Sequence, residues 1–331
     1  MMELSFAQNF SLIALNAQES TRLTNSKKVS LRCMTAAVIL EVYLNKGFTQ
    51  AGDILACERK LLEQPAIPLY QRVVFEILFG KNETISETLP GYLTRVVKMT
   101  KKQLLAVEDA FTTSLKKTNA LEEIHALLSS DLEFVTSGIE MREYRGNAEI
   151  FTRLTESIRA EILEDGSITD EVILMIWLLR ESGCLYDLFS KEELKHVSVR
   201  LYELYDTNSL GKLVFPINIH KTVEYAVKNF LKVKREVMST PSGSGIAFVF
   251  PVIERSQSIF IDTEAYFSSK EDRLHDIKKR LERNGHNITV IREGEIPLIK
   301  IDNVLYEAIP HAKQYKFPVH GVRLIKYPLS L

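Results

Sequence analysis

The sequence predicts a mainly α-helical fold: a helical bundle over residues 1–236, followed by a small α/β module over residues 246–331 with a ββαβββ-like order. Three observations predict it. Apolar residues recur at helical spacing from residue 3 to about residue 234. A turn-forming cluster, Thr240-Pro-Ser-Gly-Ser-Gly245, then interrupts the pattern. Beyond it the apolar runs are short and strand-like, and 331 residues are enough for two hydrophobic cores.

Each helix of the first part is predicted from its apolar spacing and its boundary residues. One long helix is expected over residues 90–115, with Pro90 in its first turn. Residues 121–140 fit either a helix with a tail or a short hairpin. A buried helix is expected over 170–189, and Ser190-x-x-Glu193 is a capping box for the next one. The remaining expected helices are one that begins at Phe6, Leu31–Leu44, Ile54–Leu62, Leu69–Phe79, Ile150–Ile162 and His220–Glu236.

The C-terminal module is predicted from short apolar runs around one amphipathic segment. Glu271–Arg283 places Leu274, Ile277 and Leu281 on one helical face, and Asn284-Gly285 follows as a C-cap. The expected strands are Ile246–Ile253, Ser258–Asp262, Asn287–Arg292, Val304–Ile309 and Val322–Tyr327.

Composition excludes several classes of protein. The formal net charge of −1 argues against a general nucleic-acid binder, which usually has a basic excess. No apolar run approaches the roughly 18 residues of a membrane span, so we expect a cytoplasmic protein whose membrane contact, if it has any, is peripheral. Cys33, Cys57 and Cys184 lie in apolar patterns without a C-x-x-C spacing, which is typical of reduced core thiols. No metal site and no cofactor are expected.

No nucleophile–base constellation appears in the sequence, so we expect a protein that is not an enzyme. The most suggestive chemical feature is a row of cations. Arg95, Lys98 and Lys102 are three and four residues apart, which places them on one helical face. Such a row is either a solvated surface or a site for a phosphorylated headgroup, which two to four fixed cations could hold. Arg32 belongs to a second basic cluster.

Several segments, in a shared order, resemble the Golgi phosphoprotein 3 family over residues 3–234. Leu31-Arg32-Cys33-Met34 is similar to a Leu-Arg-Gly-Cys-Met stretch of that family, and Glu76-Ile-Leu-Phe-Gly80 is similar to its Glu-Leu-Leu-x-Gly. The stripe Ile150–Leu163 and the segment Ile176–Phe189 resemble a later helix and the buried helix of the family. The module after residue 240 has no counterpart in the family.

The resemblance implies a helical peripheral membrane protein that binds phosphatidylinositol 4-phosphate and, in eukaryotes, retains Golgi enzymes by their tails. The lipid site of the family uses a tryptophan before the second long helix, an arginine at the start of that helix and an arginine pair on a later helix. Carried over, the first arginine falls on Arg32, and the tryptophan position holds Leu23. The membrane-inserting hairpin of the family would fall near residues 121–140.

The position of the arginine pair depends on the register of the later helix. Counting forward from Gly80 gives Arg95 and Lys98, which keep the spacing of three residues. Counting back from the end of the helix gives Leu105 and Glu108, which cannot bind a phosphate.

Two functions therefore remain open. The first is a non-enzymatic, peripheral-membrane protein that binds an anionic, phosphoinositide-like headgroup through Arg32, Arg95 and Lys98, with Lys102 nearby. The alternative is a soluble interaction or scaffold protein that keeps the fold, has lost the lipid site and presents the C-terminal module to a partner. The missing tryptophan favours the alternative, and the basic row favours the headgroup.

Overall fold

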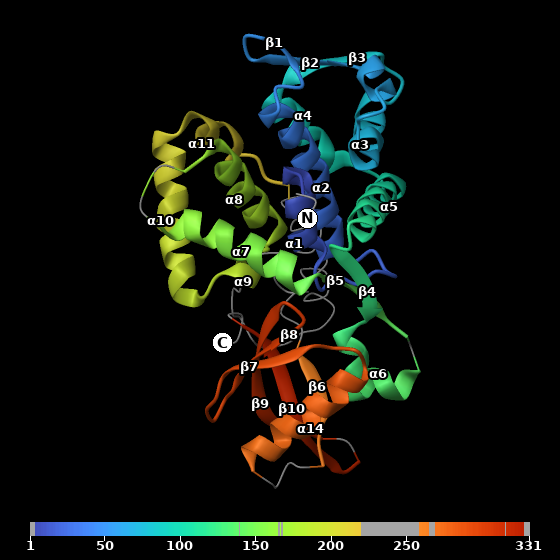
Figure 1. Ribbon diagram of the computed structural model, residues 1–331, viewed down its shortest axis with the longest axis vertical. Coiled ribbons are helices and arrows are strands. Elements are labelled where there is room, and N and C mark those ends of the chain that lie inside the picture. The colour runs from blue at the N-terminus through green and yellow to red at the C-terminus, as the bar shows by residue number, and fades with distance from the viewer. Residues whose placement is uncertain are drawn as a thin grey trace, which may run out of the picture.

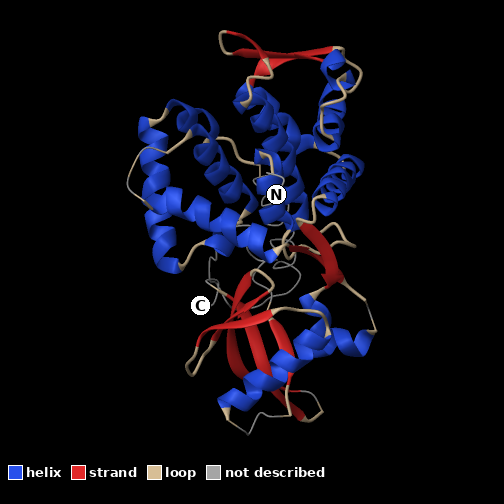
Figure 2. Ribbon diagram, viewed as in Figure 1, coloured by secondary structure: helices blue, strands red, loops and turns tan. Residues whose placement is uncertain are grey.

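A computed structural model describes residues 4–138, 140–164, 166, 168–219, 258–264, 269–314 and 316–327. The described chain is mainly helical with small sheets, and one of these sheets lies near the C-terminus, as predicted (Figures 1 and 2). This sheet has five strands, and its described order, one strand before α14 (Lys270–Arg283) and four after it, differs from the expected ββαβββ-like order. The expected helix 220–236, the expected strand 246–253 and the predicted domain boundary lie outside the described residues. Among the described helices, none combines the length and the apolar content that crossing a bilayer requires.

Most helices of the first part form where the sequence predicts them. α2 is the central one, and it packs against α1, α5 and α8 in the main hydrophobic core. The side chain of Trp177 in α8 is fully buried in this core. Apart from α4 and α6, which are described below, the described helices of this part are α1 (Phe6–Leu15), α2 (Asn25–Leu44), α3 (Leu69–Phe79), α5 (Lys101–Lys117), α7 (Ala148–Leu163), α8 (Asp170–Ser182), α9 (Leu185–Leu188), α10 (Lys191–Thr207) and α11 (Ser209–Val214). α2 begins before the expected Leu31, and α11 was not predicted.

The helix expected over 54–62 is wrong. Residues Ile54–Glu58 form strand β2, and a 3₁₀ helix, η1 (Arg59–Glu63), follows. β2 lies between β1 (Thr49–Ala51) and β3 (Thr84–Thr88) in a three-stranded antiparallel sheet. Leu55 and Cys57 point inward with the period of two that a strand requires, and a short apolar run alone does not separate this pattern from a helix.

The long helix expected over 90–115 is also wrong, because it is three elements. α4 (Leu89–Arg95) continues into the 3₁₀ helix η2 (Val96–Lys98), and α5 begins a new direction at Lys101. Met99 has extended backbone angles (φ −61°, ψ 133°), and Thr100 caps α5 in a capping box with Gln103. The buried helix expected over 170–189 likewise ends early, at Ser182, because Gly183 takes a left-handed conformation (φ 76°).

Among the described residues of the segment 121–140, which the sequence left open, there is no long helix. β4 (Leu121–His125) pairs with β5 (Arg142–Gly146), and the connection between them contains η3 (Leu127–Ser130) and α6 (Leu132–Ser137). The two-stranded ribbon lies between the helical part and the C-terminal sheet (Figure 1).

The C-terminal module is an antiparallel sheet of order β6-β10-β9-β8-β7, with α14 against it (Figure 1). Ile277 and Leu281 of α14 are buried in its core, as predicted. One strand, β8, was not predicted, and its turn into β9 uses Asp302 and Asn303 at positive φ, which these residues tolerate better than most. The elements are β6 (Ile259–Asp262), α14 (Lys270–Arg283), β7 (Ile288–Arg292), β8 (Leu298–Ile301), β9 (Val304–Gln314) and β10 (Pro318–Lys326).

The module joins the helical part through polar contacts, of which the one made by Asn303 is buried. Arg145 of β5 donates to Asp302 Oδ1 and to the Gly285 carbonyl, both at 2.8 Å. Asn303 Nδ2 donates to the Gly146 carbonyl at 2.8 Å. Leu127 of η3, in the connection between β4 and β5, belongs to the hydrophobic core of the module.

Candidate functional site

Two of the four predicted headgroup residues line one pocket. Arg95 ends α4, Lys98 ends η2, and both face a hollow of about 820 Å³ that also contacts Glu87, Thr88 and Gln103. The short turn from α4 through η2 keeps the two cations on one side of the chain. This pocket is the position at which the forward register places the arginine pair.

The charges in the pocket are only partly available to a ligand. Arg95 forms an ion pair with Glu87, whose hydrogen bond raises the pKa of the guanidinium, and it donates to the Leu78 carbonyl at 3.4 Å. Lys98 is exposed, and no carboxylate of the described residues lies within ion-pairing distance of it. Arg95, Lys98 and Glu87 together therefore carry a net charge of about +1.

The start of α5 adds positive potential beside the pocket. Lys101 and Lys102 occupy its first turn, both are exposed, and this turn contains no acidic residue. The macrodipole also places positive charge at a helix N-terminus, so lysines there are unfavourable unless an anion is close. Lys102 does not line the pocket itself.

Arg32 does not join these cations in the pocket. It lies two turns inside α2, which begins at Asn25 and not near Arg32, so the resemblance to an arginine at a helix start does not hold in space. Burial lowers the pKa of its guanidinium. Of the three cations that were predicted to converge, only Arg95 and Lys98 line this pocket, and Arg32 does not.

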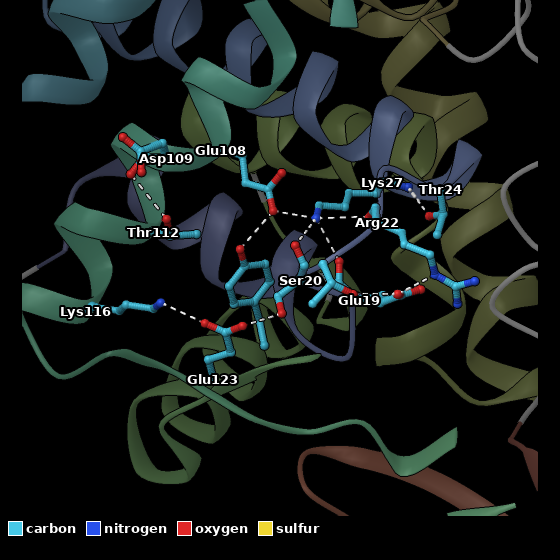
Figure 3. A network of polar contacts seen from close by, with 12 residues as sticks. Glu19, Ser20, Arg22, Thr24, Lys27, Glu108, Asp109, Thr112, Lys116 and Glu123 are labelled. Carbon is cyan, nitrogen blue, oxygen red and sulfur yellow. Dashed lines mark hydrogen bonds and ion pairs between the residues drawn. The ribbon is translucent and has the colours of Figure 1, made fainter. Parts of the chain in front are cut away.

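Counting back from the end of the helix leads instead to Leu105 and Glu108, and Glu108 takes part in an internal ion pair. α5 carries Leu105, which is 42% exposed, and Glu108, which is buried. Glu108 Oε1 lies 2.5 Å from the amine of Lys27 at the start of α2 (Figure 3). It also accepts a hydrogen bond from the Tyr144 hydroxyl at 2.8 Å. At the position to which the backward count leads, a carboxylate thus pairs with a buried cation.

Lys27 also organises the turn between α1 and α2. Its amine donates to the carbonyls of Glu19, Ser20 and Arg22 at 2.8, 3.0 and 3.2 Å (Figure 3). The Ser20 hydroxyl donates to Glu123, which ties the turn to β4 and lowers the pKa of that carboxyl. With three carbonyls and one carboxylate as partners, this buried cation has a structural role.

A second pocket, of about 470 Å³, lies where the α1–α2 turn, the ribbon and the module meet. Leu23 lines it from the turn, and Glu143, Tyr306 and Lys326 line it from the strands. Burial raises the pKa of Glu143 to about 7 and that of Tyr306 well above its usual value. No sequence pattern indicated these residues, because they lie on three strands that are distant in the chain.

Comparison with known proteins finds no family model that matches the chain and no curated protein with significant sequence similarity to it.

Proposed function

We propose that this protein is a non-enzymatic, cytoplasmic binding protein that associates reversibly with membranes by holding a phosphorylated, phosphoinositide-like lipid headgroup in the Arg95–Lys98 pocket. The observation that carries the proposal is the local concentration of positive charge: Arg95 and Lys98 in one hollow, beside the lysine-bearing start of α5. A phosphate would accept charge-assisted hydrogen bonds from both cations and would relieve the repulsion among the lysines.

The same geometry limits the affinity. Glu87 offsets one of the two cations in the pocket, and Arg32 contributes nothing there. Each cation close to an anionic membrane is worth about 1 kcal/mol, so the remaining lysines give an association that salt reverses.

The test measures binding of the full chain to phosphatidylcholine vesicles with and without phosphatidylinositol 4-phosphate. We expect binding to the anionic vesicles at about 0.1 M salt and almost none at about 0.5 M. Replacing Lys98 and Lys102 by Ala should weaken it by about 2 kcal/mol. Thermal stability should stay unchanged, because exposed substitutions usually cost under about 0.5 kcal/mol.

Lys279→Ala is the matched control, since Lys279 is an exposed lysine of the C-terminal module. It should leave vesicle binding unaltered. Arg95 is a poorer choice for substitution because its contacts with Glu87 and Leu78 hold α4 in place. Absence of binding at low salt, or normal binding by the double variant, would contradict the proposal.

A second candidate function, protein interaction through the C-terminal module, is favoured by the edge of its sheet. β7 is an edge strand of the five-stranded sheet, and its residues Val290 and Ile291 are 42% and 51% exposed. An apolar pocket of about 130 Å³ lies between α14 and this edge, with His275 and Lys278 among its lining residues. An edge strand beside an apolar pocket is the arrangement that binds an extended peptide as an added strand.

Peptide display against the folded full chain tests this candidate. We expect enrichment of extended sequences with one aliphatic residue next to acidic ones, which would match the apolar pocket and its basic rim. Val290→Lys, which places a charge in the pocket, should abolish their binding. Tyr202→Lys on α10 is the control, because Tyr202 is an exposed aromatic residue that does not line this pocket. Equal enrichment by native protein and Val290→Lys would reject the candidate.

A further inference from the structure

The outer face of α10 carries apolar side chains where a surface helix usually has polar ones. α10 lies at the outer edge of the helical part (Figure 1), and its inner face packs Val197 and Leu204 into the main core. On the outer side, Val199 is 60% exposed, Tyr202 is 78% exposed and Tyr205 is 48% exposed. Their spacing of three residues makes them neighbours on the helix surface. Single exposed apolar residues are common, but a contiguous group of them marks an interaction surface.

Four residues of α10 form one line along this outer face. Lys195, Val199, Tyr202 and Asp206 are separated by four, three and four residues. With about 3.6 residues per turn, this spacing confines them to a sector of about 60° on the side opposite the core. The same spacing marks the contact positions of a coiled coil, along which one helix packs against another. The shape of this line therefore suits a second helix.

The two ends of the line carry opposite charges. Lys195 and Asp206 are both exposed, and within the described part of the chain neither has an ion-pair partner. On the flank of the same helix, by contrast, Arg200 and Glu203 pair with each other at 3.1 Å. A helix that complements the line must therefore be negative beside Lys195, apolar in the middle and positive beside Asp206.

A second copy of α10 meets these requirements when it runs antiparallel to the first. In a pair centred between residues 200 and 201, Lys195 of each copy faces Asp206 of the other, and Val199 faces Tyr202. A parallel pair would instead place Lys195 opposite Lys195 and Asp206 opposite Asp206. The charges thus favour the antiparallel arrangement, whose two-fold symmetry limits the assembly to two chains.

We propose that the chain forms a weak homodimer in solution through antiparallel pairing of the outer faces of two α10 helices. The apolar contacts of Val199 and Tyr202 supply most of the stabilisation, because exposed ion pairs contribute little. Lys195 and Asp206 set the orientation of the pair. The line spans only about three turns, so the interface is smaller than the roughly 1,200 Å² of a stable complex. We therefore expect a dissociation constant on the order of tens of micromolar.

Sedimentation velocity of the full chain between about 1 and about 200 μM tests the proposal, since this range brackets the expected dissociation constant. The native chain should change from monomer to dimer as its concentration rises. Lys195→Asp should weaken the association at least tenfold, because both symmetry-related ion pairs become repulsive. Adding Asp206→Lys to the same chain restores opposite charges at the facing positions and should recover the association. Lys279→Asp, the same change at an exposed lysine of the C-terminal module, is the matched control and should dimerise like the native chain.

Disulfide cross-linking tests the orientation, and the three native cysteines are buried. Chains with Lys195→Cys, mixed with chains with Asp206→Cys, should form a disulfide between the two variants. Either variant alone should not, because identical positions lie about 16 Å apart along an antiparallel pair. Cross-linking of Lys195→Cys chains to each other, or unchanged association of Lys195→Asp, would overturn the proposal. So would a native chain that stays monomeric at about 200 μM, which would leave another part of the chain or a different protein to cover this face.

Discussion

Replacing Lys27 by Met should destabilise the protein by about 3–5 kcal/mol, because breaking a buried ion pair leaves its partner charge uncompensated. Lys27 and Glu108 are almost fully buried, and their charged atoms are 2.5 Å apart. Without the amine, Glu108 keeps only the Tyr144 hydroxyl among the partners described here. The three carbonyls of the α1–α2 turn lose their donor as well. Urea denaturation followed by circular dichroism measures the change in the free energy of unfolding.

Two further variants identify the cause of this loss. In the double variant Lys27→Met with Glu108→Leu both charges are absent, so we expect it to recover a large part of the stability. Lys28→Met, next along α2, removes a half-buried lysine whose hydrogen bond is to Asn25, and it should cost under about 1 kcal/mol. A single Lys27→Met variant as stable as Lys28→Met would show that the ion pair contributes little.

The sequence predicted elements well where both of their ends carry a signal. α3 has the predicted bounds because Pro68 precedes it and Gly80, at φ 57°, ends it. α10 begins where the Ser190–Glu193 capping box places it. Failures occur where the deciding contacts are tertiary. β2 is a strand because β1 and β3 pair with it, and nothing within its five residues separates a strand from a helical turn.

In the candidate sites, too, the features that depend on local structure could be predicted, and those that depend on tertiary contacts could not. Arg95 and Lys98 were found because they are three residues apart, and local structure keeps such residues on one side of the chain. Glu87, which pairs with Arg95, comes from the end of β3, and this contact depends on how that sheet packs. Arg32 was assigned by resemblance to a helix start, and the real start at Asn25 moved it away.

The proximity of Glu143, His286 and Asp302 could not be predicted from their spacing in the sequence. His286 and Asp302 come together because β7 and β8 pair, and Glu143 joins them because the ribbon lies against the module.

Trp177→Ala should also cost about 3–5 kcal/mol, because it leaves the largest cavity that one substitution can make in the main core. Trp177 is fully buried on α8, and its Nε1 donates to the Ile217 carbonyl at 3.2 Å. That hydrogen bond fixes the segment after α11 against α8, so the variant also leaves a carbonyl without its donor. Because Trp177 is the only tryptophan, the native protein should emit in the blue, and chemical denaturation should shift its emission to the red.

Trp177→Phe is the matched variant, because it retains an aromatic ring in the core and removes the Nε1 donor. We expect it to lose less stability than Trp177→Ala, so that the difference between the two reports the cavity and the remainder reports the hydrogen bond and the smaller ring. Circular dichroism must follow both unfolding transitions, since neither variant has a tryptophan. Native emission close to that of free tryptophan would place Trp177 in water, and a loss below about 1 kcal/mol for Trp177→Ala would mean that α8 does not form the centre of this core.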